Sequence, residues 1–425
     1  MPLSRRSAAD SRPNAIALAR ERMDCADLLD LSDSNPTRHG LTDPAVSEVV
    51  ARAASRPPSY DPDPRGSVRA REALAARFGG EPGDYWLTPG TSTAYSWLFA
   101  LLTDVGDQVA VPRPGYPLVE PLARLAGVET ASYPAYYLHP YGWEYELGIE
   151  GFPDRREPPC LGSVRRSGKP STIREALDGR DGSVRAVVVV HPNNPTGAYA
   201  DAAIADACAG VPMIVDEVFW PFWLGDATAS DPSPIPPRLS GATAALTFGL
   251  DGLSKLLAAP HLKLGWIRVS GPRAEAARIA PVLDRIADAY LPVSGPLADA
   301  LPDLLDLADA TVARVRERLL ANLATVQRVF DDASDANGIG GLPCRLRRVD
   351  GGWTVLVDVP RLLPDDDLVV ALMGQGLSVH PGWFYDLDSS GTLALSLLPR
   401  PDAFAAACGR LRTALAAGSV AENLR

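Results

Sequence analysis

The sequence has few cysteines, no long hydrophobic run and no basic excess, and each absence excludes a class of protein. Its five cysteines are scattered, odd in number and without CxxC spacing, so we expect neither a disulfide framework nor a zinc site. No run of roughly 18 apolar residues is present to cross a membrane, and the first residues carry arginines and acids where a signal peptide would be apolar. We therefore predict a cytoplasmic protein with no bound metal and no membrane contact.

The charge balance points away from polyanionic partners. A net charge of -11 and an isoelectric point near 5.0 argue against binding to nucleic acid, whose phosphates attract basic surfaces. The 425 residues exceed the length at which a single core keeps growing, so we expect two domains. A hydrophobic fraction of 46% is ordinary for a globular chain, and the partner we expect is a small molecule.

Residues 85–250 alternate short β runs with longer helical runs, which is typical of βα units around a mainly parallel sheet. Strands are predicted at 108–111, 130–133, 186–190, 212–215, 244–248 and 267–270, and helices at 43–54, 67–78, 273–289 and 298–333. The stretches 150–181 and 338–342 are predicted to be a surface excursion and a glycine-rich break.

The last part of the chain is of mixed type. Strands are predicted at 353–359, 377–380 and 392–398, and helices at 365–375 and 401–416. We predict an α/β fold, with a large doubly wound domain over 46–295. An N-terminal arm over 1–45, an interdomain helix and a C-terminal region over 296–425 would supply a smaller α+β domain.

The segment Gly252-Leu253-Ser254-Lys255 is the first candidate for chemistry. It follows the apolar run 244–250, which places an amine in a cleft at a strand end, where lysines form Schiff bases with aldehyde cofactors. Most lysines are solvated surface charges, so Lys255 by itself would be interpreted in that way.

Three other segments change that interpretation because of their order and spacing. They are Thr88-Pro89-Gly90-Thr91-Ser92-Thr93-Ala94, His191-Pro192-Asn193-Asn194-Pro195-Thr196-Gly197 and Ile214-Val215-Asp216-Glu217-Val218-Phe219. Together with Lys255 they resemble the fold type I enzymes that use pyridoxal 5'-phosphate, in the class I/II aminotransferase branch. The resemblance extends from about Leu31 to about Leu411.

The resemblance implies roles around the cofactor ring. Lys255 would form the Schiff base, and Asp216 would pair with the ring nitrogen and keep it protonated. Asn194 would donate to the phenolic oxygen, and Tyr116 would stack on the ring. The alternatives are a helix cap for Asp216 and a core position for Tyr116.

The phosphate would bind at a helix start. Gly90, Thr91 and Ser92 precede the apolar run 94–102 and offer backbone N–H groups, although an ordinary helix cap would look the same. The resemblance adds Ser254 and Lys263, the latter where relatives usually carry arginine. It also implies that Tyr60 reaches the phosphate of a partner subunit, and hence a homodimer with shared active sites.

Two departures from the family pattern bear on the substrate. Phe219 stands where most relatives have a tyrosine that contacts the phenolic oxygen. Ala394 stands where aminotransferases usually have the arginine that binds the substrate carboxylate, the best two-pronged partner for that group. A bulky or conjugated substrate is therefore expected, held by the arm at Asn35 and by Trp383 and Tyr385, unless these two rings belong to the core.

The function implied is that of an aminotransferase-like enzyme that forms an external aldimine with an unusual or conjugated amino acid, in specialised metabolism. Transamination, β-elimination that cleaves a C–S bond of a cysteine conjugate, and decarboxylation-coupled oxidative deamination stay open. A further resemblance is to the aminotransferase-like enzymes of lincosamide antibiotic biosynthesis. A ligand-sensing domain of a transcription regulator is disfavoured because too few residues precede Tyr60 for a DNA-binding module. A degenerate structural homologue is disfavoured because Lys255, Asp216 and Asn194 are all present.

Overall fold

A computed structural model provides the three-dimensional description of the chain. It describes residues 4, 6–7, 13–23, 28–57, 60, 62–138, 142–145, 173, 177, 184–208, 210–225, 234–241, 245–330, 344–361, 363–387 and 390–416. The predicted glycine-rich break at 338–342 lies outside these residues, as does the predicted excursion at 150–181 apart from residues 173 and 177.

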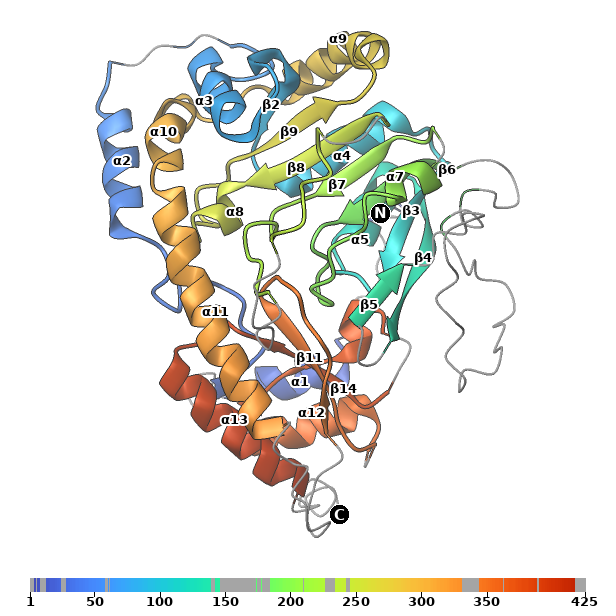
Figure 1. Ribbon diagram of the computed structural model, residues 1–425, viewed down its shortest axis with the longest axis vertical. Coiled ribbons are helices and arrows are strands. Elements are labelled where there is room, and N and C mark those ends of the chain that lie inside the picture. Colours follow the sequence, from blue (N-terminus) through green and yellow to red (C-terminus); the bar gives the residue numbers. More distant parts are fainter. Residues whose placement is uncertain are drawn as a thin grey trace.

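An eight-stranded sheet forms the larger part of the molecule (Figure 1). Its strand order is β2 (Tyr85–Thr88), β9 (Gly265–Ser270), β8 (Thr247–Gly252), β7 (Met213–Asp216), β6 (Val184–Val190), β3 (Gln108–Arg113), β4 (Glu129–Leu138) and β5 (Gly142–Tyr145). The five strands from β8 to β4 are parallel, whereas β9 runs antiparallel to both of its neighbours and β5 runs antiparallel to β4. This confirms the predicted α/β class with a mainly parallel sheet.

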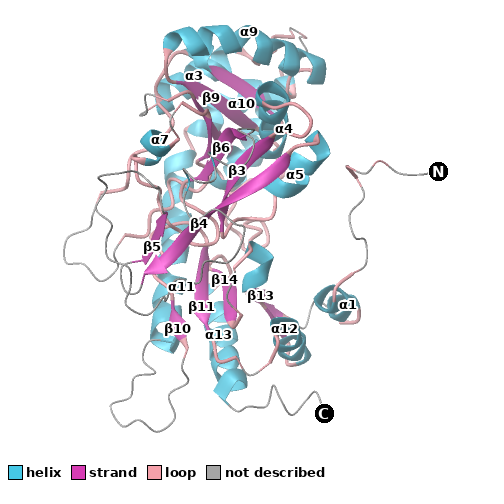
Figure 2. Cartoon of the chain, turned by 90° about the vertical axis from the view of Figure 1, so that its right-hand side faces the viewer, coloured by secondary structure: helices cyan, strands magenta, loops and turns pink. Residues whose placement is uncertain are grey.

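The central strands are apolar on both faces, because helices and loops cover each side. In β6, Ala186, Val188 and Val190 belong to one core cluster, while Val187 and Val189 belong to another. The first cluster packs beneath α4 (Thr91–Leu102), α5 (Val119–Ala126) and α9 (Arg273–Tyr290), and the second includes α7 (Ile204–Ala207). Figure 2 shows α4 and α5 on one side of the sheet and α7 on the other. This period-two burial is what makes a strand of a parallel sheet uniformly hydrophobic.

A third core cluster lies at the β2 edge. It joins α2 (Pro44–Ala54), α3 (Val68–Phe78) and α10 (Gly295–Leu305) to β2, to the short helix α8 (Leu253–Leu256) and to the start of β9. A single 3-10 turn, η2 (Pro82–Asp84), leads into β2. The long helix α11 (Ala308–Phe330) then runs from this part of the molecule to the other domain (Figure 1).

The smaller domain has two buried clusters on a four-stranded sheet. The strand order is β10 (Arg345–Leu346), β11 (Thr354–Asp358), β14 (Thr392–Ser396) and β13 (His380–Pro381). Around it lie α1 (Ala15–Glu21), α11, α12 (Asp365–Gly374), η3 (Gly382–Tyr385) and α13 (Pro401–Ala416). The N-terminal β1 (Leu29–Asp30) pairs in parallel with β12 (Leu377–Ser378), so part of the arm is built into this domain.

The predicted domain limits stay a prediction, and the packing of α10 bears on them. This helix contacts α2 and α3 and shares their core cluster, although the predicted limit assigns it to the C-terminal part.

Several predicted elements have different limits in the structure. The strand predicted at 244–248 is Thr247–Gly252, because β9 pairs with it as far as Gly252. The single helix predicted at 298–333 is divided into α10 and α11, which pack on different cores, and Pro302 removes a backbone donor before the break. The strand predicted at 377–380 is divided between β12 and β13, which pair with different strands. The pairing of β5 with β4 was not predicted.

Among the residues that the structure describes, no helix combines the length and apolar character needed to cross a lipid bilayer.

Asn322 links α11 to the segment that follows β14, and replacing its side chain should destabilise the fold. Its fully buried amide nitrogen donates to the carbonyls of Leu397 and Pro399, at 2.8 Å each. Asn322→Ala leaves both carbonyls without this donor, so we expect a loss of about 1–3 kcal/mol in the free energy of unfolding. Urea denaturation followed by circular dichroism measures it. Leu320→Ala, at a side chain that is 37% exposed on the same helix, is the control. An equal loss in both variants would contradict the role of the two hydrogen bonds.

Candidate active site

The candidate site lies where three parallel strands end. His191 follows β6, Asp216 ends β7, and β8 leads through Gly252 into α8, which carries Lys255. The backbone holds these ends in register, because the His191 N–H donates to the Asp216 carbonyl at 2.8 Å. The carboxyl edge of an open α/β sheet is where such folds bind ligands.

Asp216 is a buried carboxylate with two donors. The Tyr95 hydroxyl donates to Oδ2 at 3.2 Å, and the Val218 N–H donates to Oδ1 at 3.2 Å. Burial raises the pKa of Asp216 to about 6, and these two hydrogen bonds and Lys255 oppose the rise. A buried acid in this state is stabilised by a nearby cation, such as a protonated ring nitrogen. Tyr95 was not predicted as a site residue, because a tyrosine in an apolar helix gives no signal of the strand it will face.

Lys255 has its amine against two aromatic rings. Its Nζ lies 5.3 Å from the centroid of the Phe219 ring and 4.9 Å from that of Trp353. Burial lowers the pKa of Lys255 to about 8, Asp216 opposes this, and Lys263 lowers it further. Trp353 comes from the small domain and meets Phe219 edge to face at 5.4 Å. It was not predicted, because the sequence separates it from Lys255 by about a hundred residues.

The predicted phosphate site is formed by close backbone approach. Gly90, at a φ of 129°, precedes α4, and no side chain caps this helix. A Cβ added to Gly265 would lie 3.2 Å from the Cα of Gly90, so this approach needs glycine. Thr91 and Ser92 supply the first helical turn, Ser254 is half-buried at the start of α8, and Lys263 is exposed.

The residues present fit pyridoxal 5'-phosphate. Asp216 provides a buried acid for the ring nitrogen, Lys255 an amine whose pKa is lowered, and the start of α4 uncapped backbone donors for a phosphate. No group of three or more metal-ligating side chains occurs among the described residues.

Three further residues are predicted to contact the cofactor. Asn194 is half-buried in a loop held by Asn193, whose amide donates to the Pro114 carbonyl at 3.2 Å. Tyr116 is 49% exposed, with its ring 6.5 Å from that of Tyr385. Tyr60 is 75% exposed, as a side chain that serves a partner subunit would be before assembly. Their contacts with the cofactor stay predictions.

The predicted substrate residues divide into two groups. Asn35 lines a cavity of 360 Å³ together with Lys255. Ala394 is 2% exposed in β14, between Leu356 on β11 and His380 on β13.

The two aromatic candidates do not line that cavity. Tyr385 is 6% exposed and packs in the cluster that contains Ala394. Trp383 is 39% exposed and donates from Nε1 to Asp366 at 2.8 Å. These surroundings favour the packing alternative for Tyr385, and substrate binding by either ring stays a prediction.

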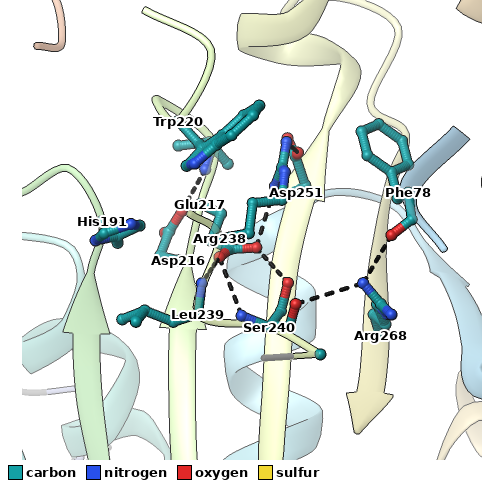
Figure 3. A network of polar contacts seen from close by, with 12 residues as sticks. Phe78, His191, Asp216, Glu217, Trp220, Arg238, Leu239, Ser240, Asp251 and Arg268 are labelled. Carbon is teal, nitrogen blue, oxygen red and sulfur yellow. Dashed lines mark hydrogen bonds and ion pairs between the residues drawn. The ribbon is translucent and has the colours of Figure 1, made fainter. Parts of the chain in front are cut away.

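A buried ionic network lies at the carboxyl ends of β7 and β8, next to the candidate site (Figure 3). Arg238 donates to Glu217 at 3.1 Å and to Asp251 at 2.9 Å, and all three side chains are largely buried. Glu217 directly follows Asp216, and Asp251 directly precedes Gly252, so the network holds both neighbours of the site. Glu217 also accepts from the backbone N–H groups of Leu239 and Ser240.

The charges in this network depend on one another. Burial alone would lower the pKa of Arg238, but Asp251 and Glu217 outweigh it and raise that pKa. Burial raises the pKa of Asp251 to about 6 although Arg238 opposes the rise. The Arg238 guanidinium also lies 4.4 Å from the Trp220 ring centroid. Sequence reasoning missed this network, because its members join three segments that only the fold brings together.

Comparison with known proteins identifies the family of the chain. Residues 26–346, more than half of the chain, match the family model described as aminotransferase class I and II. The chain is 26% identical to the alanine aminotransferase of Mycobacterium tuberculosis over 290 residues, which cover 64% of this chain and 59% of that protein. It is 25% identical to the S-alkyl-thiohydroximate lyase SUR1 of Arabidopsis thaliana over 301 residues, which cover 67% of this chain and 56% of that protein. The chain thus matches less than two thirds of these relatives' length.

Among solved structures, the chain is similar to an alanine aminotransferase from Pyrococcus furiosus. The TM-score is 0.77 at 18% identity, with 97% of this chain and 99% of that one covered. At this identity the likeness shows the fold.

Burial lowers the pKa of the Lys255 amine and the charge of Asp216 opposes this, so the pH at which the amine reacts should change when Asp216 is neutralised. The chain has three lysines, Lys169, Lys255 and Lys263, so mass spectrometry can follow each after reductive methylation with formaldehyde. We expect labelling of Lys255 in the cofactor-free protein to rise as the pH passes about 8, where the amine loses its proton. Asp216→Asn removes the charge that raises this pKa, so the curve should move to lower pH. Exposed Lys263 is the internal reference for reagent concentration, and a curve that stays in place or moves to higher pH would contradict the coupling.

Arg238 should stabilise the fold most strongly at high pH. Arg238→Met leaves two buried acids without their cation, a change that costs about 3–5 kcal/mol in comparable pairs. Without Arg238 the folded-state pKa of Asp251 rises further. The deficit should therefore be smallest below about pH 6, where Asp251 is protonated with or without Arg238, and grow as the pH rises above that value. Urea denaturation at pH 5.5 and pH 8 measures this. Arg268→Met is the control, because Arg268 donates to the carbonyls of Phe78 and Ser240 and has no carboxylate partner among the described ion pairs. A deficit independent of pH would count against the ionic role.

Proposed function

Because the chain belongs to the class I and II aminotransferase family, we propose that it is a pyridoxal-phosphate-dependent enzyme acting on an unusual or conjugated amino acid. Members of this family use pyridoxal 5'-phosphate. When bound, this cofactor withdraws electrons from a substrate carbon joined to it through nitrogen. The observation that carries the unusual substrate is the buried alanine at position 394.

The proposed roles follow from the state of each side chain. Asp216, with a pKa of about 6, is ionised at neutral pH, and its charge would stabilise a proton on the ring nitrogen of a bound cofactor. Lys255, with a pKa of about 8, has an unprotonated fraction at neutral pH that can bind the aldehyde and can accept a proton from the substrate carbon. Phe219 and Trp353 border the amine with apolar rings and limit water around it.

Alanine at position 394 stands in place of the arginine that usually binds the substrate carboxylate. A hydrogen-bonded charge pair is worth about 1.5–3 kcal/mol and also orients the bond to be broken. With alanine there, simple dicarboxylic or aliphatic amino acids should bind poorly, and affinity must come from other parts of a larger substrate.

A C–S lyase reaction is the second candidate. The missing clamp loosens control over which bond reacts, and one of the relatives bears the name S-alkyl-thiohydroximate lyase. β-Elimination from a cysteine conjugate is therefore a specific alternative to transamination, and decarboxylation-coupled oxidative deamination is a further one. The same reasoning supports a place in specialised metabolism, with lincosamide-type antibiotic biosynthesis as the case that the sequence resembles.

We also propose a homodimer, because exposed Tyr60 would complete the phosphate site of a second copy. The cytoplasmic location stays a prediction from composition.

A substrate panel tests the proposed function. The purified protein with pyridoxal 5'-phosphate is incubated with alanine, aspartate, glutamate, S-methyl-cysteine and S-benzyl-cysteine, with and without a keto-acid acceptor. We expect turnover of the S-conjugates well above that of aspartate or glutamate. Pyruvate formed without an acceptor indicates β-elimination, and a new amino acid formed with an acceptor indicates transamination. Efficient transamination of aspartate or glutamate would overturn the unusual-substrate proposal.

A variant at position 394 tests the missing clamp directly. Ala394→Arg should lower the KM for aspartate by about tenfold, in line with a gain near 1.4 kcal/mol. Ala394→Met, of similar length without charge, is the matched control for crowding in this buried strand. An Arg variant that gains no more than the Met variant would show that the cation at 394 is not what is missing.

A further inference from the structure

The cavity beside Lys255 is lined by two further side chains that carry a positive charge. Arg20 of α1 and Arg38 of the arm line it, along with Asp30, Asp33 and His380. None of these was singled out in the sequence, because α1 and the arm lie more than two hundred residues from Lys255.

Arg20 and Ala394 are both neighbours of His380. The charge of Arg20 acts on His380, and His380 is the cross-strand neighbour of Ala394 in the β13–β14 pair. The Leu31 carbonyl accepts from the Ser396 N–H at 2.6 Å, which ties the arm to β14 two residues after Ala394. The arm therefore places a guanidinium on a wall of the cavity that holds Lys255.

Among the described residues, Arg20 is oriented by a single acidic partner. Its Nη2 donates to Asp30 at 2.9 Å. Asp30 in turn accepts from the backbone N–H of Ser32 at 2.8 Å and from its hydroxyl at 2.5 Å. Burial would raise the pKa of Asp30, but the Ser32 hydrogen bonds and Arg20 outweigh it, so the carboxylate stays charged. A guanidinium has five N–H donors, so an arginine held along one edge can bind a second carboxylate along another.

The other basic groups of the cavity are less suited to this role. Burial lowers the pKa of His380, and although Asp30 opposes this, the ring is neutral at pH 7 and above. Arg38 has a side chain that is 69% exposed and reaches Asp33 only at 3.5 Å, whereas the side chain of Arg20 is 43% exposed. Lys255 is needed for the cofactor.

We propose that Arg20, carried by the N-terminal arm, binds the carboxylate on the α-carbon of the substrate in place of a side chain at position 394. This rests on the proposed function for the identity of the substrate as an amino acid. Arg20 is partly exposed and shared with Asp30, so it holds a carboxylate less firmly than a buried, dedicated arginine. Simple amino acids accordingly stay poor substrates, and a conjugate needs further contacts.

Calorimetry with an amine-free ligand tests this independently of turnover. The probe is 3-(benzylthio)propanoate, which has the carboxylate and thioether of S-benzyl-cysteine but no amine, and its primary amide is the uncharged comparison. Both are titrated into the full chain loaded with pyridoxal 5'-phosphate. We expect the wild type to prefer the acid over the amide, and Arg20→Met to lose about tenfold of that preference. Arg20→Lys should restore part of it, because an ammonium keeps the charge without the two-pronged geometry.

Arg38→Met is the matched control, since it removes a cation that lines the same cavity. A preference unchanged in Arg20→Met, absent in the wild type, or lost equally in Arg38→Met overturns the proposal. Failure of the proposed function is distinguished from these results. A protein that prefers the acid through Arg20 but turns over no amino acid has lost the proposed function and kept this inference. A protein that turns over S-conjugates, but whose preference for the acid does not change in Arg20→Met, keeps the proposed function and contradicts this inference.

Discussion

The ion pairs of Arg238 with Glu217 and Asp251 are the constraint on which the site depends. They join the residue after Asp216 to the residue before Gly252, across the ends of β7 and β8. Because two buried acids share a single guanidinium, the loop that carries Arg238 must stay closed over the strand ends. The separation between the acid at Asp216 and the amine at Lys255 is therefore fixed by packing and charge beneath the site.

The small domain also contributes to the surroundings of Lys255 at the carboxyl edge of the large sheet. Trp353 of the small domain lies against the Lys255 amine. The N-terminal arm, which pairs with β12 and is hydrogen-bonded to β14, forms another wall of the cavity. Neither domain alone forms the complete surroundings of Lys255. A change in how the domains pack would therefore alter the amine's environment as well as the shape of the cavity.

The sequence predicted those features whose cause is local. Gly90 to Ser92, Asp216 and Lys255 each lie where a strand ends or a helix begins, positions that periodicity and turn residues predict, although their proposed roles come from the family resemblance. The predicted helix at 401–416 has the limits that the structure gives. Tyr95, Trp353 and Arg238 could not be predicted, because their roles depend on which distant segment each one faces. The division of 377–380 between two sheets has the same origin: a run of β-formers does not specify its partner strand.

Ala394 illustrates why the loss of a motif residue is not the loss of its chemistry. In the sequence it marks a missing cation, and the strand itself offers no substitute, because its neighbours across the sheet are Leu356 and a neutral His380. The fold, however, lays an N-terminal strand beside β12 and ties it to β14, and Arg20 at the start of this arm lines the same cavity as Lys255. A cation attached to an arm is less rigid than one on a central strand, because fewer packed neighbours hold it. A substrate whose carboxylate binds to such an arm needs further contacts to hold it in place. The alanine at position 394 therefore fits a substrate larger than a simple amino acid.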